Sequence, residues 1–211
     1  MNNYVKGKSV AFVAMGTTIE GKGLGKVIDS FDVVIRTNIF PIPEQYQNDY
    51  GTRCNIISML KTSAIKPEMF SERGIKFVIH YSFMEESRKS PLLGYYHMTI
   101  KRRNDIKKDI IRLIAQNPGH GTSGINIINT VLKCGAKSLT CFGMSGFQDK
   151  QGNLLEHNEA KHYIGLIDVK KARYPIRRHP AHKFAVQNNY VRYLLKNKLI
   201  TMDQHSLEYF Q

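Results

Sequence analysis

The sequence has few cysteines, few acidic residues and no long apolar run. Its three cysteines, Cys54, Cys134 and Cys141, are odd in number and lack the spacing of a metal site. No stretch approaches the ~20 apolar residues that a helix needs to cross a bilayer. The first residues lack the apolar segment of a signal peptide. We therefore expect neither a cysteine-bound metal nor a transmembrane segment.

The shortage of acidic residues makes the chain strongly basic. There are 31 Lys and Arg against 17 Asp and Glu, which gives a formal net charge of +14. Such a charge points to a polyanionic partner, namely nucleic acid, an anionic membrane surface or a phosphorylated saccharide. Solubility is the alternative explanation, although a domain of this size needs less charge for it. We expect the 211 residues, 42% of them hydrophobic, to form one domain spanning residues 1–211.

Residues 9–38 organise the predicted fold. Residues 10–15 and 32–35 are short apolar runs typical of strands buried on both faces. Between them lie a loop containing Gly16, Gly21, Gly23 and Gly25 and a helical or turn-like segment at 26–31. Further buried strands are expected at 54–59, 75–80 and 137–143, and a helix at 104–116. This pattern predicts a parallel sheet whose carboxyl edge holds a ligand.

The glycines of this loop allow a dinucleotide-binding interpretation, which the pattern does not favour. Their spacing differs from Gly-x-Gly-x-x-Gly, and they lie several residues beyond the end of the first strand. No acidic residue ends the second strand, where Arg36 and Asn38 stand instead. An NAD oxidoreductase is therefore a weak alternative, and the glycines could simply make tight turns.

A second informative stretch begins near residue 118. Thr122 and Ser123 are N-cap types ahead of an apolar helix that runs to about Cys134. Such a helix N-terminus presents free N–H groups and a positive dipole end, which suits a phosphate. Gly124 would let a ligand approach the backbone closely. The alternative is a simple capped core helix without a ligand.

Taken together, these stretches resemble the eukaryotic-type sialyltransferases. The first stretch keeps the residues of the family's large sialylmotif in order and in register: Gly21, Gly23, Gly25, Ile28, Asp29, Asp32, Val33, Arg36, Asn38 and Pro41. The second stretch resembles the small sialylmotif, with Thr122-Ser123-Gly124, a helix ending in cysteine and a strand ending at Gly143. The resemblance implies a single doubly wound α/β domain of Rossmann-like type with a mainly parallel sheet.

The resemblance also implies a glycosyltransferase site. In the family, the Ser/Thr-Gly step binds the donor nucleotide, so the expected donor contacts are Gly16, Thr17, Asn38, Thr122, Ser123 and Gly124. Lys161-His162-Tyr163 resembles the third motif, whose His supports the departing phosphate. His182, with Gln187 in place of the family's Glu, resembles the last motif, whose His is the catalytic base. His179 is a close neighbour and an alternative base.

The chain differs from the family in two places. Met15 stands where the family has an Asn that contacts the cytidine nucleotide, which counts against CMP-sialic acid as the donor. Cys134 matches one half of the family disulfide, but residues 1–38 contain no cysteine to pair with it. We therefore expect a reducing, cytoplasmic location, which would be the host cytoplasm if the chain is phage-encoded.

The expected reaction is an inverting transfer of a sugar from a nucleotide sugar to an acceptor hydroxyl. The chain contains no Asp-x-Asp pair of the kind that holds a divalent ion in many sugar transferases, so neither a metal nor another cofactor is expected.

The acceptor is inferred from charge. Basic residues cluster ahead of the proposed base and are expected to contact the acceptor: Lys170, Lys171, Arg173, Arg177 and Arg178. A polyanionic acceptor follows, and DNA carrying a hydroxylated base is preferred here, as in phage-type DNA glycosyltransferases. Two alternatives stay open. One is a CMP-sialic acid-dependent sialyltransferase acting on a glycan or lipooligosaccharide, and the other is a non-catalytic nucleic-acid-binding module.

Overall fold

The structure of the chain is a computed structural model. It describes residues 1–37, 41–59, 74–81, 97–98, 122–155 and 184–211. The helix predicted at 104–116 lies outside these residues.

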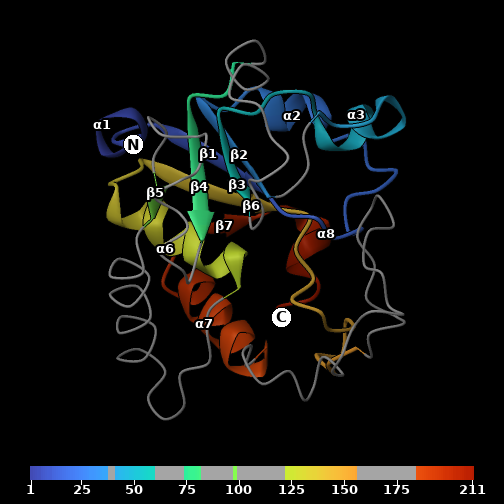
Figure 1. The fold of residues 1–211 in the computed structure, drawn as a ribbon. Helices are drawn as coiled ribbons and strands as arrows, with labels where there is room; N and C mark the ends of the chain where they lie inside the picture. The colour runs from blue at the N-terminus through green and yellow to red at the C-terminus, as the bar shows by residue number, and fades with distance from the viewer. Residues whose placement is uncertain (38–40, 60–73, 82–96, 99–121, 156–183) are drawn as a thin grey trace.

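A seven-stranded sheet forms the centre of the described structure (Figure 1). Its strands are β1 (Ser9–Val13), β2 (Val33–Thr37), β3 (Ile56–Met59), β4 (Phe77–Tyr81), β5 (His97–Met98), β6 (Ser138–Phe142) and β7 (Thr201–Met202). Their order is β5-β4-β3-β2-β1-β6-β7, and every neighbouring pair is parallel. The chain therefore winds outward from β1 in both directions, which confirms the predicted doubly wound, Rossmann-like class.

The sheet is buried on both faces because β1 alternates apolar side chains between two clusters. Val10 and Phe12 pack with α6 (Ser123–Lys133) and α7 (Phe184–Lys196). Ala11 and Val13 pack with α2 (Gly25–Asp29) and α3 (Glu44–Tyr50) on the opposite face. Burial on both faces explains why the strand reads as a continuous apolar run in the sequence.

The short helices α1 (Asn2–Val5) and α8 (Gln204–Leu207) complete the described elements. Val5 of α1 is fully buried in the cluster under α6 and α7, and Asp203 caps α8. Within the described part of the chain, every helix is too short or too polar to cross a membrane.

The motif residues Asp29 and Arg36 hold the α2–β2 region together. Arg36 is buried, and its guanidinium donates to the carbonyls of Arg53 (2.7 Å) and Tyr50 (2.6 Å). The Asp29 carboxylate accepts from the backbone N–H groups of Thr52 (2.7 Å) and Arg53 (2.9 Å). These two members of the large sialylmotif therefore stabilise the scaffold.

Candidate functional site

The candidate site lies at the carboxyl ends of β1 and β6. These two strands are neighbours, yet the strand that follows β1 in the chain (β2) and the strand that follows β6 (β7) lie on opposite sides of this pair. In open parallel sheets, ligands bind in the crevice at this kind of switch point. The loop after β1 (residues 14–18) and the loop after β6 (residues 143–148) border it.

The two loops touch at their bases. Backbone N–H groups of Ala14 and Gly16 donate to the carbonyls of Phe142 and Gly143, each at 2.8 Å. A Cβ on Gly16 would lie 2.5 Å from the Gly143 carbonyl oxygen, so any larger residue would push the loops apart. The Tyr50 hydroxyl donates to the Gly16 carbonyl at 2.9 Å, which ties this loop to α3.

The N-terminus of α6 lies beside the β1 end of the site. The Thr122 hydroxyl accepts from the Ile125 N–H and caps the helix. A Cβ added to Gly124 would lie 3.5 Å from the Phe12 ring of β1, so the first turn packs directly on that strand. The N–H groups of a first turn have no partner inside the helix, and they favour negative charge. The sequence predicted this capped helix start, and the binding of a phosphate to it stays a prediction.

Gln187 joins α7 to the beginning of α6. Its side chain is buried, and its Oε1 accepts from the Thr122 N–H at 2.9 Å. Gln187 stands where the resemblance places the family's Glu. The bond links α7 to the start of α6 through an amide oxygen instead of a carboxylate.

The glycine-rich loop before α2 has a structural role. The N–H groups of Gly21 and Gly23 both donate to the Asp49 carboxylate at 2.7 Å. A Cβ on Gly25 would lie 2.3 Å from the Gln47 carbonyl oxygen, where α2 approaches α3. Since the loop N–H groups are already bonded to Asp49, they are not available to cradle a phosphate. The turn interpretation of these glycines therefore holds over the dinucleotide interpretation.

Met15 lies below the site instead of in it. Its side chain is buried in the apolar cluster that includes Ile19, Ile28 and Tyr50. The replacement of the family's Asn therefore removes an amide without placing a thioether against the ligand. The argument from Met15 against CMP-sialic acid rests on this missing amide contact, and it stays a prediction.

The three cysteine thiols are buried, and none of them forms a disulfide with another described residue. Burial raises the pKa of the Cys54 thiol to about 12 and raises the pKa of the Cys141 thiol further. Both thiols stay protonated near neutral pH, so neither acts as a nucleophile. Among the described residues, no group of three His, Cys, Asp or Glu could hold a metal ion.

The structure brings together part of the predicted site. Gly16 and the exposed Thr17 lie in the β1 loop, and Thr122, Ser123 and Gly124 form the start of α6. The other predicted residues lie outside the described residues: Asn38, His162, Lys170, Lys171, Arg173, Arg177, Arg178, His179 and His182. Their roles stay predictions.

Sequence reasoning missed the residues that brace the β6 loop. Asn188 of α7 donates to the Gly146 carbonyl (2.9 Å) and to Gln148 Oε1 (3.0 Å). Ser206 Oγ accepts from the Met144 N–H at 3.0 Å. A signal was available for α8, because Asp203 precedes it as an N-cap type. Asn188 and Gln148 carry no such local signal.

Comparison with known proteins gives the family. The family model described as glycosyltransferase family 29 (sialyltransferase) matches residues 5–116, more than half of the chain. A comparison with curated proteins found no match. The fold is similar to the crystal structure of a mammalian sialyltransferase, with a TM-score of 0.62, 16% identity, and coverage of 93% of this chain and 68% of that one.

A second similar structure is a mammalian sialyltransferase in complex with Gal-beta-1-3GalNAc-ortho-nitrophenol. Its TM-score is 0.62 and its identity 16%, and the match covers 95% of this chain and 71% of that one. The sheet that positions the switch point is thus shared with sialyltransferases, and the chain belongs to glycosyltransferase family 29, the sialyltransferase family.

Proposed function

We propose that this glycosyltransferase moves a sialic acid from CMP-sialic acid to a hydroxyl of a glycan acceptor. Family membership supports this reading, since the matched family is that of the sialyltransferases. The DNA acceptor, which was preferred from charge, the expected cytoplasmic location and Met15, has no support from the family or from the fold. A CMP-sialic acid-dependent sialyltransferase, the first of the two alternatives, fits both the family and the fold.

One structural observation carries the proposal. The capped N-terminus of α6 packs on Phe12 near the carboxyl end of β1, the strand that leads into the loop with Gly16 and Thr17 and borders the switch point with β6. A nucleotide monophosphate leaving group carries the negative charge that such a helix end favours. The side-chain hydroxyls of Thr17 and Ser123 add polar partners at the same edge.

The proposed mechanism is a single displacement with inversion. The acceptor oxygen attacks the anomeric carbon of sialic acid while the bond from that carbon to the CMP phosphate oxygen breaks. His182 takes the proton of the acceptor hydroxyl, and the N–H groups at the start of α6, with His162, stabilise the phosphate that leaves. Gln187, five residues after His182, fixes α7 to the Thr122 N–H. The transfer is proposed to need no metal.

The acceptor class follows from one similar structure and from charge. That mammalian sialyltransferase was crystallised with a Gal-beta-1-3GalNAc compound, so we propose a galactose-ended glycan for this chain. The net charge of +14 favours a version that also carries phosphate or carboxylate, such as lipooligosaccharide. In this scheme Lys170, Lys171, Arg173, Arg177 and Arg178 contact the anionic part.

A donor and acceptor matrix tests the function. Release of CMP or UDP is measured from CMP-sialic acid and from UDP-sugars, with and without excess EDTA. The acceptors are Gal-beta-1-3GalNAc, deacylated lipooligosaccharide and hydroxymethylated duplex DNA. We expect CMP release with the glycans, a preference for the charged one, and no effect of EDTA.

Base substitutions complete the test. His182→Ala should lower turnover by roughly 10²–10⁴-fold with donor affinity nearly unchanged, whereas His179→Ala should stay near the parent rate. Turnover of a UDP-sugar on DNA, without turnover of CMP-sialic acid on any glycan, would overturn the proposal.

A further inference from the structure

The segment after α7 reaches the candidate site from the far edge of the sheet. β7 pairs with β6, and the Asp203 N–H donates to the Cys141 carbonyl at 3.0 Å. α8 follows immediately, so that it lies at the carboxyl ends of the strands (Figure 1). None of the sialylmotif residues lies in this segment, residues 201–211, and the proposed mechanism assigns it no role.

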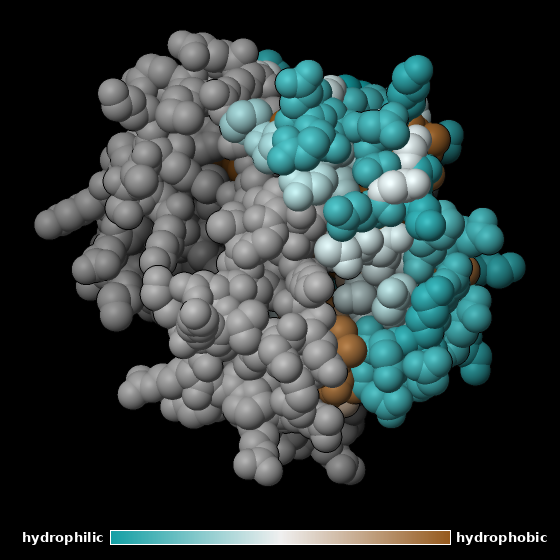
Figure 2. All heavy atoms as spheres, turned by 90° about the vertical axis from the view of Figure 1, so that its right-hand side faces the viewer, coloured by the Kyte–Doolittle hydropathy of each residue, from teal (hydrophilic) through white to brown (hydrophobic). Residues whose placement is uncertain are grey.

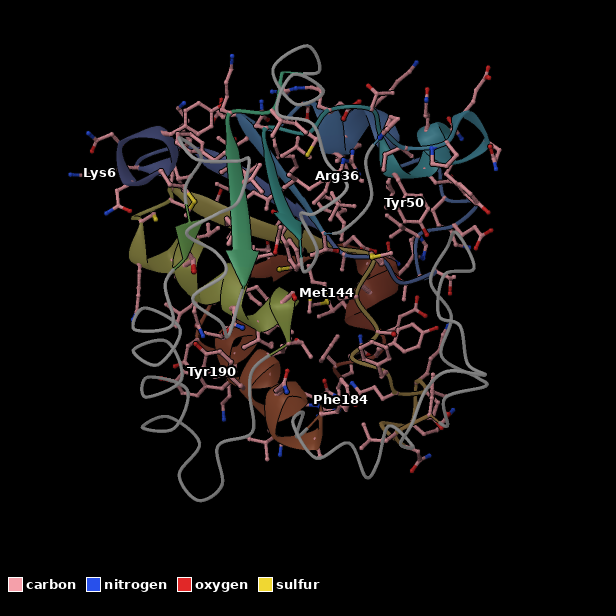
Figure 3. All side chains as sticks on the ribbon, in the orientation of Figure 1. Lys6, Arg36, Tyr50, Met144, Phe184 and Tyr190 are labelled. Atoms are coloured by element: carbon pink, nitrogen blue, oxygen red, sulfur yellow. The ribbon has the colours of Figure 1, made fainter. Side chains whose placement is uncertain are left out.

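A single hydroxyl in α8 links both loops of the site. Ser206 is fully buried, and its Oγ lies 2.7 Å from Thr18 Oγ1 in the β1 loop. The same Oγ accepts from the Met144 N–H in the β6 loop at 3.0 Å. Met144 lies beside α8 at the ends of the strands (Figure 3). Since one oxygen serves both contacts, its position sets the spacing between the two loops.

The position of Ser206 is itself fixed by Asp203. One carboxylate oxygen of Asp203 accepts from the N–H groups of His205 (3.0 Å) and Ser206 (2.9 Å), which orders the only turn of α8. The other oxygen accepts from the Gly143 N–H at 3.3 Å. Asp203 therefore fixes Ser206 relative to the β6 loop, and Ser206 in turn contacts the β1 loop.

Beyond their backbone bonds at the base, the loops after β1 and β6 are joined through Ser206. Their backbone hydrogen bonds lie at the base, from Ala14 to Phe142 and from Gly16 to Gly143, and both chains then continue to residues 17–18 and 144–146. Thr17, an expected donor contact, stands between Gly16 and Thr18. Its position is thus held on one side by the glycine contact and on the other by Ser206.

We propose that Ser206 is a positioning residue that sets donor affinity by fixing the spacing of the loops after β1 and β6. The inference rests on the proposed function in one respect, namely that the donor binds between these loops. Loss of the Ser206 hydroxyl leaves the Met144 N–H and the Thr18 hydroxyl without this shared partner, so both loops gain freedom that the donor must then remove.

Four variants separate positioning from general destabilisation. Ser206→Ala removes both contacts, Thr18→Val removes one, and Thr18→Ser keeps the hydroxyl. Thr201→Val is the control within residues 201–211, because Thr201 Oγ1 makes a 2.8 Å hydroxyl contact with Thr140 Oγ1 of β6, at an exposed position away from both loops. Donor KM, kcat and the midpoint of urea unfolding are measured for each.

We expect Ser206→Ala to raise the donor KM roughly tenfold, the size of one to two lost hydrogen bonds, with a much smaller change in kcat. Thr18→Val should raise it about threefold, and Thr18→Ser and Thr201→Val should stay within about twofold of the parent protein. A donor KM for Ser206→Ala equal to that of Thr201→Val would overturn the proposal.

A ligand-free measurement keeps the inference separate from the proposed function. Amide hydrogen exchange is followed for peptides that cover residues 14–18 and 143–148. Ser206→Ala should speed exchange in both peptides by roughly tenfold, while Thr201→Val should not. If the parent protein ignores CMP-sialic acid, the proposed function fails and this exchange result alone decides on Ser206. Unchanged exchange in both loops would sink the positioning role whatever the donor.

Discussion

Gln187 is the residue whose role can be tested with the least disturbance. Replacing it with Leu leaves the Thr122 N–H without its 2.9 Å acceptor at a part-buried position. We expect a loss of about 1–3 kcal/mol in unfolding free energy, because a part-buried N–H loses its acceptor. We also expect a lower kcat, because the proposed base, His182, lies two residues before α7 in the chain. Urea unfolding and CMP release measure the two effects.

Two further substitutions complete the test of Gln187. Gln187→Glu restores the family's residue and keeps an acceptor, so it should retain stability and activity. Asn189→Leu, on the exposed side of α7, is the control for adding an apolar group. Equal losses for Gln187→Leu and Asn189→Leu would contradict an orienting role.

Gly16 and Gly124 look alike in sequence but should respond differently to alanine. A Cβ on Gly16 would lie 2.5 Å from a backbone oxygen, whereas a Cβ on Gly124 would meet the Phe12 ring at an ordinary 3.5 Å. Gly16→Ala should therefore unfold the protein at lower urea concentration. Gly124→Ala should fold at least as stably as the parent, because its methyl group makes only ordinary contact with the Phe12 ring and alanine lowers the entropy cost of forming α6.

Urea unfolding of the two variants beside the parent protein distinguishes these outcomes. Equal unfolding midpoints for Gly16→Ala and Gly124→Ala would contradict the close approach of the loops after β1 and β6 at Gly16.

At the scale of elements, the sequence predicted the buried strands β1 to β4 and β6 and the helix α6, but not the 13-residue helix α7. The apolar runs at 10–15 and 137–143 became β1 and β6, and Thr122 became the N-cap of an 11-residue helix as expected. β7 and α8 were not predicted, because two-residue and four-residue elements hold no periodicity. They form through pairing with β6 and through Asp203, which are tertiary contacts that the local pattern does not encode.

The starts of β1 and β2 are joined by an acid-sensitive contact. The Ser9 hydroxyl and N–H donate to Asp32 Oδ2 at 2.7 and 2.8 Å. These bonds, with Lys8 and Lys137 nearby, hold the pKa of Asp32 below its ordinary value of 3.8. A depressed carboxyl pKa contributes stability above the unfolded-state pKa, and this is lost as pH falls through the folded-state value.

Asp32→Asn should therefore be less stable than the parent from pH 5 to 7 by a constant amount. The difference should shrink below about pH 4, where the carboxyl of the unfolded parent chain becomes protonated. Urea unfolding at pH 7, 5, 4 and 3 measures it, with Glu20→Gln, an exposed loop residue, as control. A difference that stayed constant down to pH 3 would show that the carboxylate charge is not what matters.

At the scale of the whole molecule, the sheet joins segments that are far apart in the chain. β1 near the amino end pairs with β6, and β6 pairs with β7 near the carboxyl end. The described atoms on the side of α3 and α8 are mostly hydrophilic (Figure 2). The doubly wound order could be expected from the resemblance, but the contact of the chain's last residues with the core could not. It depends on packing between segments almost 200 residues apart.

Phe210 shows how strongly the fold depends on its last residues. It is 4% exposed and belongs to the same apolar cluster as Val5 and Val10 from the other end of the chain. Its neighbour Tyr209 accepts a hydrogen bond at its carbonyl from the buried Gln148 side chain. Phe210→Ala should therefore cost about 3–5 kcal/mol of unfolding free energy, because it opens a cavity in the main core.

Tyr193→Ala is the control, since Tyr193 is 40% exposed on α7 and should cost much less. Urea unfolding compares the stability of the two variants, and titration of the folded protein with the donor measures their donor affinity. Phe210→Ala should lower stability and leave donor affinity within a few-fold of the parent, whereas Ser206→Ala should mainly lower affinity. If both variants lost affinity in proportion to stability, the carboxyl-terminal segment would act on the site only by keeping the protein folded.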